Sequence, residues 1–325
     1  MIKILNAVVA ILGGVAGAML LYWVLNTLVT RLPGKWEERL KPWVFIGPAL
    51  VFVSLFLIYP AIRTLILSFG NNDSSKFVGL SNYVELLTST AFLGTLLNTL
   101  LWVILVPPVV VVIGLAIAVL TDRLGARSEK TVKSLIFLPM AISMVAAATI
   151  WAFVYTSRPA GQPQIGLLNA VWTALGGQPV AWLQIDTFKL NSILLMLIIV
   201  WAQAGFAMVL LSAAIKSVPE ETIEAARIDG ASEVQSFFRV VVPQIWPTVI
   251  TVFITVLITT LKIFDIIWVM TGGNFDTNVI AVQFFIELFT NGNNGYAAAI
   301  VIILMIAINP VMVYQVRQFR RQEAT

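Results

Sequence analysis

Seven long apolar runs divide this chain, and they constrain its fold more than any other feature. A helix needs about 20 residues to cross the hydrocarbon core of a bilayer. The backbone finds no water partner there, so it must cross as a helix, and the runs lack the alternation of a barrel strand. The runs cover residues 6–30, 42–69, 95–120, 134–156, 190–211, 247–271 and 296–316. The sequence therefore predicts an all-α polytopic membrane protein with about seven transmembrane helices.

The composition excludes most soluble and catalytic classes. Charged residues make up only 11% of the chain, against about a quarter in soluble domains. The chain has no cysteine and no histidine, which removes disulfides, thiolate chemistry and imidazole metal ligands. The basic residues form short clusters between the apolar runs, with no basic face interleaved with aromatic residues. We therefore expect membrane lipid as the surroundings, no nucleic-acid partner and no metal site.

The distribution of basic residues predicts the orientation in the membrane. Fourteen of the 20 Lys and Arg residues lie in the loops 31–41, 121–133 and 212–246 and in the tail after 316, and four lie in the alternate set of loops. Cytoplasmic loops are the ones enriched in Lys and Arg. The sequence thus predicts an N-terminus outside the cell and a cytoplasmic C-terminus.

The first apolar run has two interpretations. A cleaved secretory signal carries a basic segment ahead of a shorter apolar core, whereas here Lys3 precedes the run and four basic residues follow it. We therefore expect a retained helix. This divides the chain into an extra N-terminal helix with its linker, 1–41, and a membrane core, 42–325.

A short amphipathic helix is expected at 166–177, in an external segment. Its apolar stripe consists of Leu167, Leu168, Val171, Trp172 and Leu175. Two interpretations remain open: a lid on the helix bundle, or a docking surface for an external partner.

The polar loop 217–247 contains the signals of two helices. Ser217 with Glu220 has the spacing of a capping box, and Gly230 ends the first helix. Ser232 with Gln235 repeats the spacing for a second helix, which we expect to stop at Pro243. The second helix has one apolar face, which consists of Val234, Phe237, Phe238, Val241 and Val242.

This hairpin is either an ordinary solvated loop or a docking element. Exposed charge on a helix is usually just solvated. The docking interpretation rests on Ala225 and Ala226, whose small side chains allow close approach by another protein, and on Glu224 and Asp229, which can pair with basic groups there.

The loop resembles a known signature, the EAA loop of permease subunits in binding-protein-dependent ATP-cassette importers. The residues that carry the resemblance are Glu224, Ala225, Ala226, Asp229, Gly230, Ala231, Phe238, Pro243 and Pro247. The resemblance implies that the loop forms a coupling helix, which inserts into a cleft of an ATPase subunit and presents Glu224 to a basic residue. It also implies a type I importer permease core of six spans, here with one extra N-terminal helix.

The nucleotide chemistry is expected on other chains. The sequence has no GxxxxGK[ST] phosphate loop, so it does not hydrolyse ATP by that route. The resemblance implies a second permease subunit, two ATPase subunits that hold ATP and Mg, and an external solute-binding protein. We expect no enzymatic activity in this chain and no cofactor bound by it.

Further segments resemble the sugar-importing branch related to the maltose permease. They are Leu97-Asn98-Thr99-Leu100, Phe137-Leu138-Pro139, Gly166-Leu167-Leu168-Asn169, Val269-Met270-Thr271-Gly272-Gly273 and Gly295-Tyr296-Ala297-Ala298-Ala299. Asn274-Phe275 replaces the Gly-Pro of many sugar permeases, as in the α-glucoside and glucosylglycerol-type subgroup. The implied cargo is a di- or oligosaccharide or a glucoside.

A sugar pathway needs polar and aromatic groups near the middle of the bundle. Gln203 is the strongest candidate, because an amide within a bilayer needs a partner. The resemblance also assigns Phe206, the region of Thr260, Met140 and Met144 to the pocket. The full predicted pathway consists of Trp201, Gln203, Phe206, Thr259, Thr260, Met140 and Met144. Threonines in spans often bond their own preceding carbonyls, and the two methionines leave open whether the second permease shares the pocket.

Lys262 and Asp265 are charged residues within the sixth run. Three positions apart on a helix, they would share one face and neutralise each other; gating or substrate contact is the alternative.

Two other functions compete with the importer. An ion-coupled secondary transporter would carry membrane-buried carboxylates or histidines, and a membrane enzyme would need a catalytic set. Apart from Asp265 the runs lack such groups.

Overall fold

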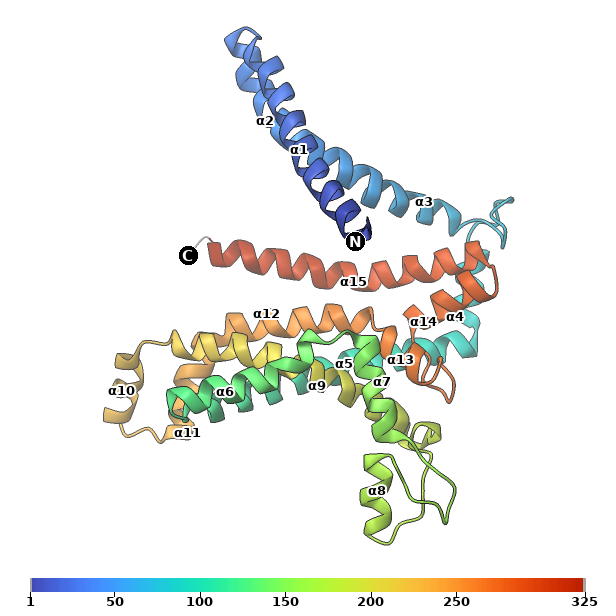
Figure 1. The fold of residues 1–325 in the computed structure, drawn as a ribbon, viewed down its shortest axis with the longest axis vertical. Helices are drawn as coiled ribbons and strands as arrows, with labels where there is room; N and C mark the ends of the chain where they lie inside the picture. The colour runs from blue at the N-terminus through green and yellow to red at the C-terminus, as the bar shows by residue number, and fades with distance from the viewer. Residues whose placement is uncertain (1, 324–325) are drawn as a thin grey trace. The chain divides into compact units, whose positions relative to one another are not determined.

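The computed structural model describes residues 2–323, and its regular secondary structure in that range is helical, apart from an isolated bridge between Gly70 and Phe77. The chain forms two compact units that divide after Ile66 (Figure 1). The predicted boundary after residue 41 lies within the second helix of the chain, Gly34–Val53. We describe each unit by itself.

The N-terminal unit contains two long apolar helices. α1 (Ile2–Thr30) is followed after Pro33 by α2 (Gly34–Val53), the π-helical turn η1 (Ser54–Ile58) and α3 (Tyr59–Leu67). The ring of Tyr22 stacks on Phe45 at 6.0 Å between centroids, and its hydroxyl donates to the Phe45 carbonyl at 3.3 Å. Most apolar side chains of these helices are exposed, as expected of helices whose surroundings are lipid.

The second unit contains twelve helices within the described residues. They are α4 (Ser81–Thr88), α5 (Thr90–Asp122), α6 (Ala126–Phe137), α7 (Met144–Tyr155), α8 (Leu167–Ala174), α9 (Leu190–Lys216), α10 (Glu220–Ile228), α11 (Glu233–Ser236), α12 (Val242–Leu261), α13 (Asp265–Met270), α14 (Ile280–Phe285) and α15 (Asn294–Glu323). Short 3-10 segments η2 (Leu138–Ala141), η3 (Trp182–Gln184) and η4 (Thr187–Lys189), and the π turns η5 (Phe237–Val241) and η6 (Ile286–Thr290), join them.

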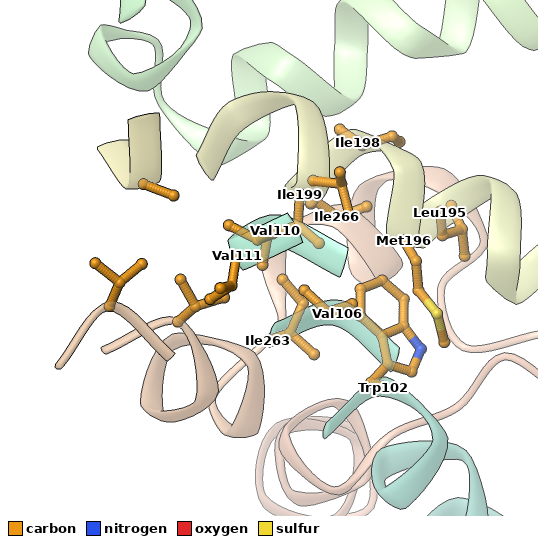
Figure 2. Close-up of a cluster of buried hydrophobic side chains, with 14 of the residues drawn as sticks. Trp102, Val106, Val110, Val111, Leu195, Met196, Ile198, Ile199, Ile263 and Ile266 are labelled. Atoms are coloured by element: carbon orange, nitrogen blue, oxygen red, sulfur yellow. The ribbon is translucent and has the colours of Figure 1, made fainter. Parts of the chain in front are cut away.

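The core of this unit lies where α5, α9 and α12 pack together. Figure 2 shows Trp102, Val106 and Val110 of α5 against Leu195, Met196 and Ile199 of α9. Gly114 makes the close approach possible, because a Cβ at this position would lie 2.5 Å from that of Ala207. The prediction of an all-α membrane protein is confirmed.

The predicted spans are confirmed in number but not all in shape. Residues 2–323 contain six helices that are long and apolar enough to cross a membrane, or seven if one bent pair is counted as a span. That pair is the predicted span 134–156, which bends by 103° between Ala141 and Met144. Pro139 lies in a 3-10 turn at the bend, and Ser143 caps α7 by accepting from the Ala146 amide at 3.2 Å. A proline followed by an N-cap residue is a local signal for ending one helix and starting another.

The predicted amphipathic helix is present as α8, which lies beyond the end of α7 (Figure 1). Leu167, Val171 and Leu175 of its apolar stripe are exposed. Trp172 packs edge-on against Trp182, with ring centroids 5.9 Å apart.

Candidate functional site

The polar hairpin consists of α10 and α11 and projects from the end of the bundle (Figure 1). Its first helix begins at Glu220 with Pro219 as N-cap. The predicted cap at Ser217 is wrong, because the Ser217 hydroxyl donates to the Ala214 carbonyl at 2.7 Å and so closes α9 instead. Glu220 and Glu221 in the first turn and Arg227 in the last complement the helix dipole.

The turn between the two hairpin helices follows the predicted signals. Gly230 adopts a left-handed conformation with φ of 81°, and the Ala231 amide donates to the Ala226 carbonyl at 3.0 Å. Ser232 and Gln235 form the predicted capping box. Both features are local in sequence, which is why the pattern alone located them.

An ion pair joins the two hairpin helices across this turn. Arg227 Nε donates to Glu233 Oε1 at 2.9 Å, and Arg227 Nη2 donates to Glu233 Oε2 at 3.4 Å. The hydrogen bond to Glu233 raises the pKa of Arg227 above its usual value. An arginine side chain is charged at any physiological pH, and its two hydrogen bonds to Glu233 join α10 to α11.

The second hairpin helix continues into the membrane. The prediction that it stops at Pro243 is wrong: α11, η5 and α12 form one continuous helix from Glu233 to Leu261. The π turn ends at Val241, two residues before Pro243, and a π turn ends at Ile58, two residues before Pro60. A proline removes a backbone donor and crowds the preceding turn, and a π turn absorbs this mismatch.

The predicted apolar face of this helix is only partly buried. Val241 is buried and Phe237 packs against the core, whereas Val234 and Phe238 are exposed. A cavity of about 430 Å³ is lined by side chains of α5, α9, α10, α11 and η5. The hairpin is therefore not packed tightly against the bundle along its whole length.

The residues of the predicted docking motif lie on the outside of the hairpin. Glu224, Ala225, Asp229 and Gly230 are exposed, and Ala226 and Ala231 are partly buried. Ile228, the last residue of α10, is 86% exposed, which is unusual for a large apolar side chain at the end of a polar helix.

A group of charged side chains fastens the base of the hairpin to the bundle. Glu129 of α6 accepts from Lys133 and from Lys216, each at 2.5 Å. Lys216 at the end of α9 also lies 3.5 Å from Asp122 at the end of α5, and Lys133 donates to Ser212. These side chains tie together α5, α6 and α9 four residues before α10 begins.

Gln203 lies on α9 and is partly buried. Within residues 2–323 its amide makes no hydrogen bond. Two residues further, Gly205 lies against the α6 end, where a Cβ would lie 2.5 Å from the Ile136 carbonyl oxygen and 2.8 Å from Phe137 Cα. This contact brings α9 next to the bend of the fourth span, which contains Met140 and Met144.

The other predicted pathway residues differ in how much surface they offer. Trp201 packs edge-on against Trp151 at 5.9 Å, and Phe206 packs against the core. Met140 is 40% exposed, and Met144 packs against the core. Of these four side chains, Met140 is therefore the most exposed, and the other three are partly buried against the core.

The threonines of α12 are satisfied within their own helix. Thr259 donates to the Thr255 carbonyl at 2.9 Å, and Thr260, which is fully buried, donates to the Val256 carbonyl at 2.8 Å. While the Thr259 hydroxyl donates to the Thr255 carbonyl, it can only accept a hydrogen bond from a ligand.

Lys262 and Asp265 do not share a helical face, so this part of the prediction is wrong. α12 ends at Leu261, and Asp265 opens the separate helix α13 after a break of non-helical backbone at Phe264. The described residues contain no ion pair between the two side chains.

A family model matches residues 88–323, and its description is "Binding-protein-dependent transport system inner membrane component". The match covers α5 to α15 and includes the hairpin and Gln203. The chain belongs to this permease family. As a permease it is a transport component of the inner membrane and not an enzyme.

Curated relatives of the permease extend the similarity to the N-terminal unit. The chain is 40% identical to the alpha-glucoside transport system permease protein AglF of Rhizobium meliloti over 98% of both chains. It is 48% identical to the osmoprotective compounds uptake permease protein GgtC of Synechocystis, over 86% of this chain and 99% of that one.

A solved structure matches the fold of the permease. The chain superimposes on a subunit of a bacterial ABC transporter involved in the import of the acidic polysaccharide alginate with a TM-score of 0.74. The match covers 89% of this chain and 99% of that one at 21% identity, which supports the fold alone. The predicted permease fold is confirmed.

Sequence patterns missed the charged group around Glu129 in this permease. Lys133 follows Glu129 by four residues, which is visible in the sequence. Lys216 and Asp122 come from two other helices, and no local signal connects them to Glu129.

Proposed function

We propose that this permease passes a neutral glucoside, or a di- or oligosaccharide, across the inner membrane as one subunit of an ATP-driven importer. The observation that carries the proposal is the 40% identity over 98% of both chains with the alpha-glucoside permease. The assembly would contain a second permease, two ATPase subunits that hold ATP and Mg, and an external solute-binding protein. The N-terminus would lie outside and the C-terminus in the cytoplasm.

The hairpin is the proposed contact with the ATPase. Its exposed Glu224, Ala225 and Asp229 offer a shallow, acidic surface, and its exposed Ile228 offers an apolar contact at the tip. The ion pair between Arg227 and Glu233 holds the two hairpin helices together, and the ion pairs of Glu129 and Lys216 hold the base of the hairpin to the bundle. Together they would let the hairpin move with α5, α6 and α9 rather than independently of them. Coupling requires such a rigid connection, because motion of the ATPase must reach the bundle.

The bundle interior around Gln203 is the proposed cargo pathway. The amide has no partner within residues 2–323, and a sugar hydroxyl would supply one. Trp201 and Phe206 offer ring faces on the same helix. The Thr259 and Thr260 hydroxyls, which are already satisfied, would contribute less.

The test is reconstitution of the complete transporter in vesicles. We expect methyl α-glucoside, maltose or glucosylglycerol, presented with the binding protein, to stimulate ATP hydrolysis and to accumulate inside. Accumulation that persists without ATP and follows an ion gradient would overturn the proposal. ATP-dependent uptake of a different solute class, with none of these sugars taken up, would overturn the cargo assignment.

A further inference from the structure

A second cavity lies at the end of the bundle remote from the hairpin. Its lining comes from the end of α7, from η3 and from the segment 269–275. η3 precedes the first residue of α9, whereas α10 follows its last. A helix of 27 residues, as α9 is, separates the two ends by about 40 Å. The cavity is therefore separate from the hairpin.

Aromatic side chains supply part of the cavity wall. Tyr155, Trp182 and Phe275 all line it. The Tyr155 hydroxyl donates to the Leu194 carbonyl at 2.8 Å, which fixes its ring, and the edge contact with Trp172 fixes that of Trp182. Rings held in this way offer preformed apolar faces to a ligand.

The polar groups of the cavity are neutral. Ser157 and Gln184 line it, and their side chains make no hydrogen bond within residues 2–323. Trp182 lines the cavity with its ring, and its buried indole nitrogen has no acceptor in the same range. None of the lining residues is charged. The cavity thus suits a neutral ligand with several hydroxyls.

The wall that contains Phe275 has a strained backbone. Phe275 and Asp276 both have φ of 56°, in the left-handed region. The buried side chain of Asn191 donates to the Phe275 carbonyl at 2.6 Å, and that of Asn98 donates to the Asp276 carbonyl at 2.9 Å. Lys189 pairs with the Asp276 carboxylate. Strain that the surroundings hold in place is frequent at ligand sites.

We propose that this cavity binds one neutral sugar ring at the end of the permease where cargo enters. Its volume of about 290 Å³ is close to the lower end of ordinary ligand pockets, about 300 Å³, which suits one ring of a glucoside. The proposal rests on the proposed function for its ligand class and for the side of entry. It adds a site that cargo meets before the pathway around Gln203.

The test uses a photoreactive probe, a methyl α-glucoside that carries a diazirine, on the complete transporter in lipid nanodiscs. Peptide mass spectrometry is expected to find the label at residues 155–157, 181–184 or 269–275, and excess methyl α-glucoside is expected to remove it. Phe275→Ala and Gln184→Ala are each expected to lower this labelling about tenfold, as loss of a contact worth about 1.4 kcal/mol would. The corresponding glucuronide probe is expected not to label.

Phe188→Ala is the matched control. Phe188 is also an aromatic residue with a left-handed backbone, with φ of 53°, and it does not line the cavity. Labelling is expected to persist in this variant. Copurification of the ATPase subunits reports whether each variant assembles. If Phe275→Ala does not assemble, Phe275→Leu is tested in its place.

Two outcomes separate this inference from the proposed function. The first outcome would overturn the sugar site in this cavity and leave the proposed function standing. It is either normal uptake of the glucoside with label only near Gln203, or label that Phe275→Ala and Gln184→Ala leave unchanged. Absence of both uptake and labelling for every neutral sugar probe would overturn the two together.

Discussion

Arg227 and Glu233 join the two helices of the hairpin across the left-handed Gly230, with the Arg227 Nε at 2.9 Å from the Glu233 carboxylate. The pair is six residues apart in sequence and lies on the protein surface. An exposed pair contributes little to stability by itself. Its effect is on geometry, because the pair sets the angle between the helix that carries Glu224 and the helix that enters the membrane.

Reversing this pair tests its geometric role. We expect Arg227→Glu to lower copurification of the ATPase and uptake, because two acidic groups would then repel across the turn. The double variant Arg227→Glu with Glu233→Arg should recover a substantial part of both. Hydrogen exchange over residues 220–236 measures the order of the hairpin directly. A double variant no better than the single one would contradict the role.

Glu224 is expected to contact a basic group of the ATPase. Glu224→Lys should abolish uptake and weaken ATPase copurification, because like charges would meet at the contact. Glu221→Lys is the matched control, since it makes the same charge change on the same exposed helix, outside the motif. Equal transport by Glu224→Lys and Glu221→Lys would refute the assignment.

Gln203→Leu should lower uptake about two- to tenfold, the range expected for loss of one hydrogen bond to the cargo. Assembly should be unchanged, because the amide bonds to no other group within residues 2–323. Thr255→Val is the comparison, since the Thr255 hydroxyl is already bonded to the Thr251 carbonyl at 2.8 Å. Undiminished uptake in Gln203→Leu would remove this residue from the pathway.

Gly205→Ala should disturb the contact between α9 and the bend of the fourth span. The new Cβ would lie 2.5 Å from the backbone oxygen of Ile136. Because this oxygen belongs to the backbone, rotation of a side chain cannot relieve the clash. We expect a lower melting temperature of the purified transporter. Gly94→Ala in α5 is the control, because nothing lies within 4 Å of its Cβ position. Equal melting temperatures would show that α9 shifts without cost.

Glu129→Gln should uncouple the ATPase from transport. It removes the shared partner of Lys133 and Lys216 and leaves two lysines close together at the base of the hairpin. We expect ATP hydrolysis to continue with less uptake per ATP consumed. Lys41→Gln, in the i,i+4 pair with Glu37 in the N-terminal unit, is the control for loss of an ion pair. An unchanged ratio of uptake to hydrolysis would contradict the prediction.

Features that depend on neighbours in sequence were predictable. The apolar runs located the helices because hydrocarbon enforces a helix wherever the chain crosses it. Gly230 and the Ser232 to Gln235 box located the hairpin turn because a left-handed residue and a cap act within a few positions. The predicted docking motif, in which Glu224, Ala225 and Asp229 are exposed, came from the same local pattern together with the resemblance, and its role stays a prediction.

Other features appeared only when distant segments met. Lys216 pairs with Glu129 because α6 packs beside α9, and Asn191 fixes Phe275 although 84 residues separate them. The helix between Lys262 and Asp265 breaks although both lie in one apolar run. The sequence by itself determined where helices, turns and caps form, because those depend on energies within a few residues. The tertiary structure decided which polar groups pair and where the backbone bends, because those depend on packing between segments far apart in the chain.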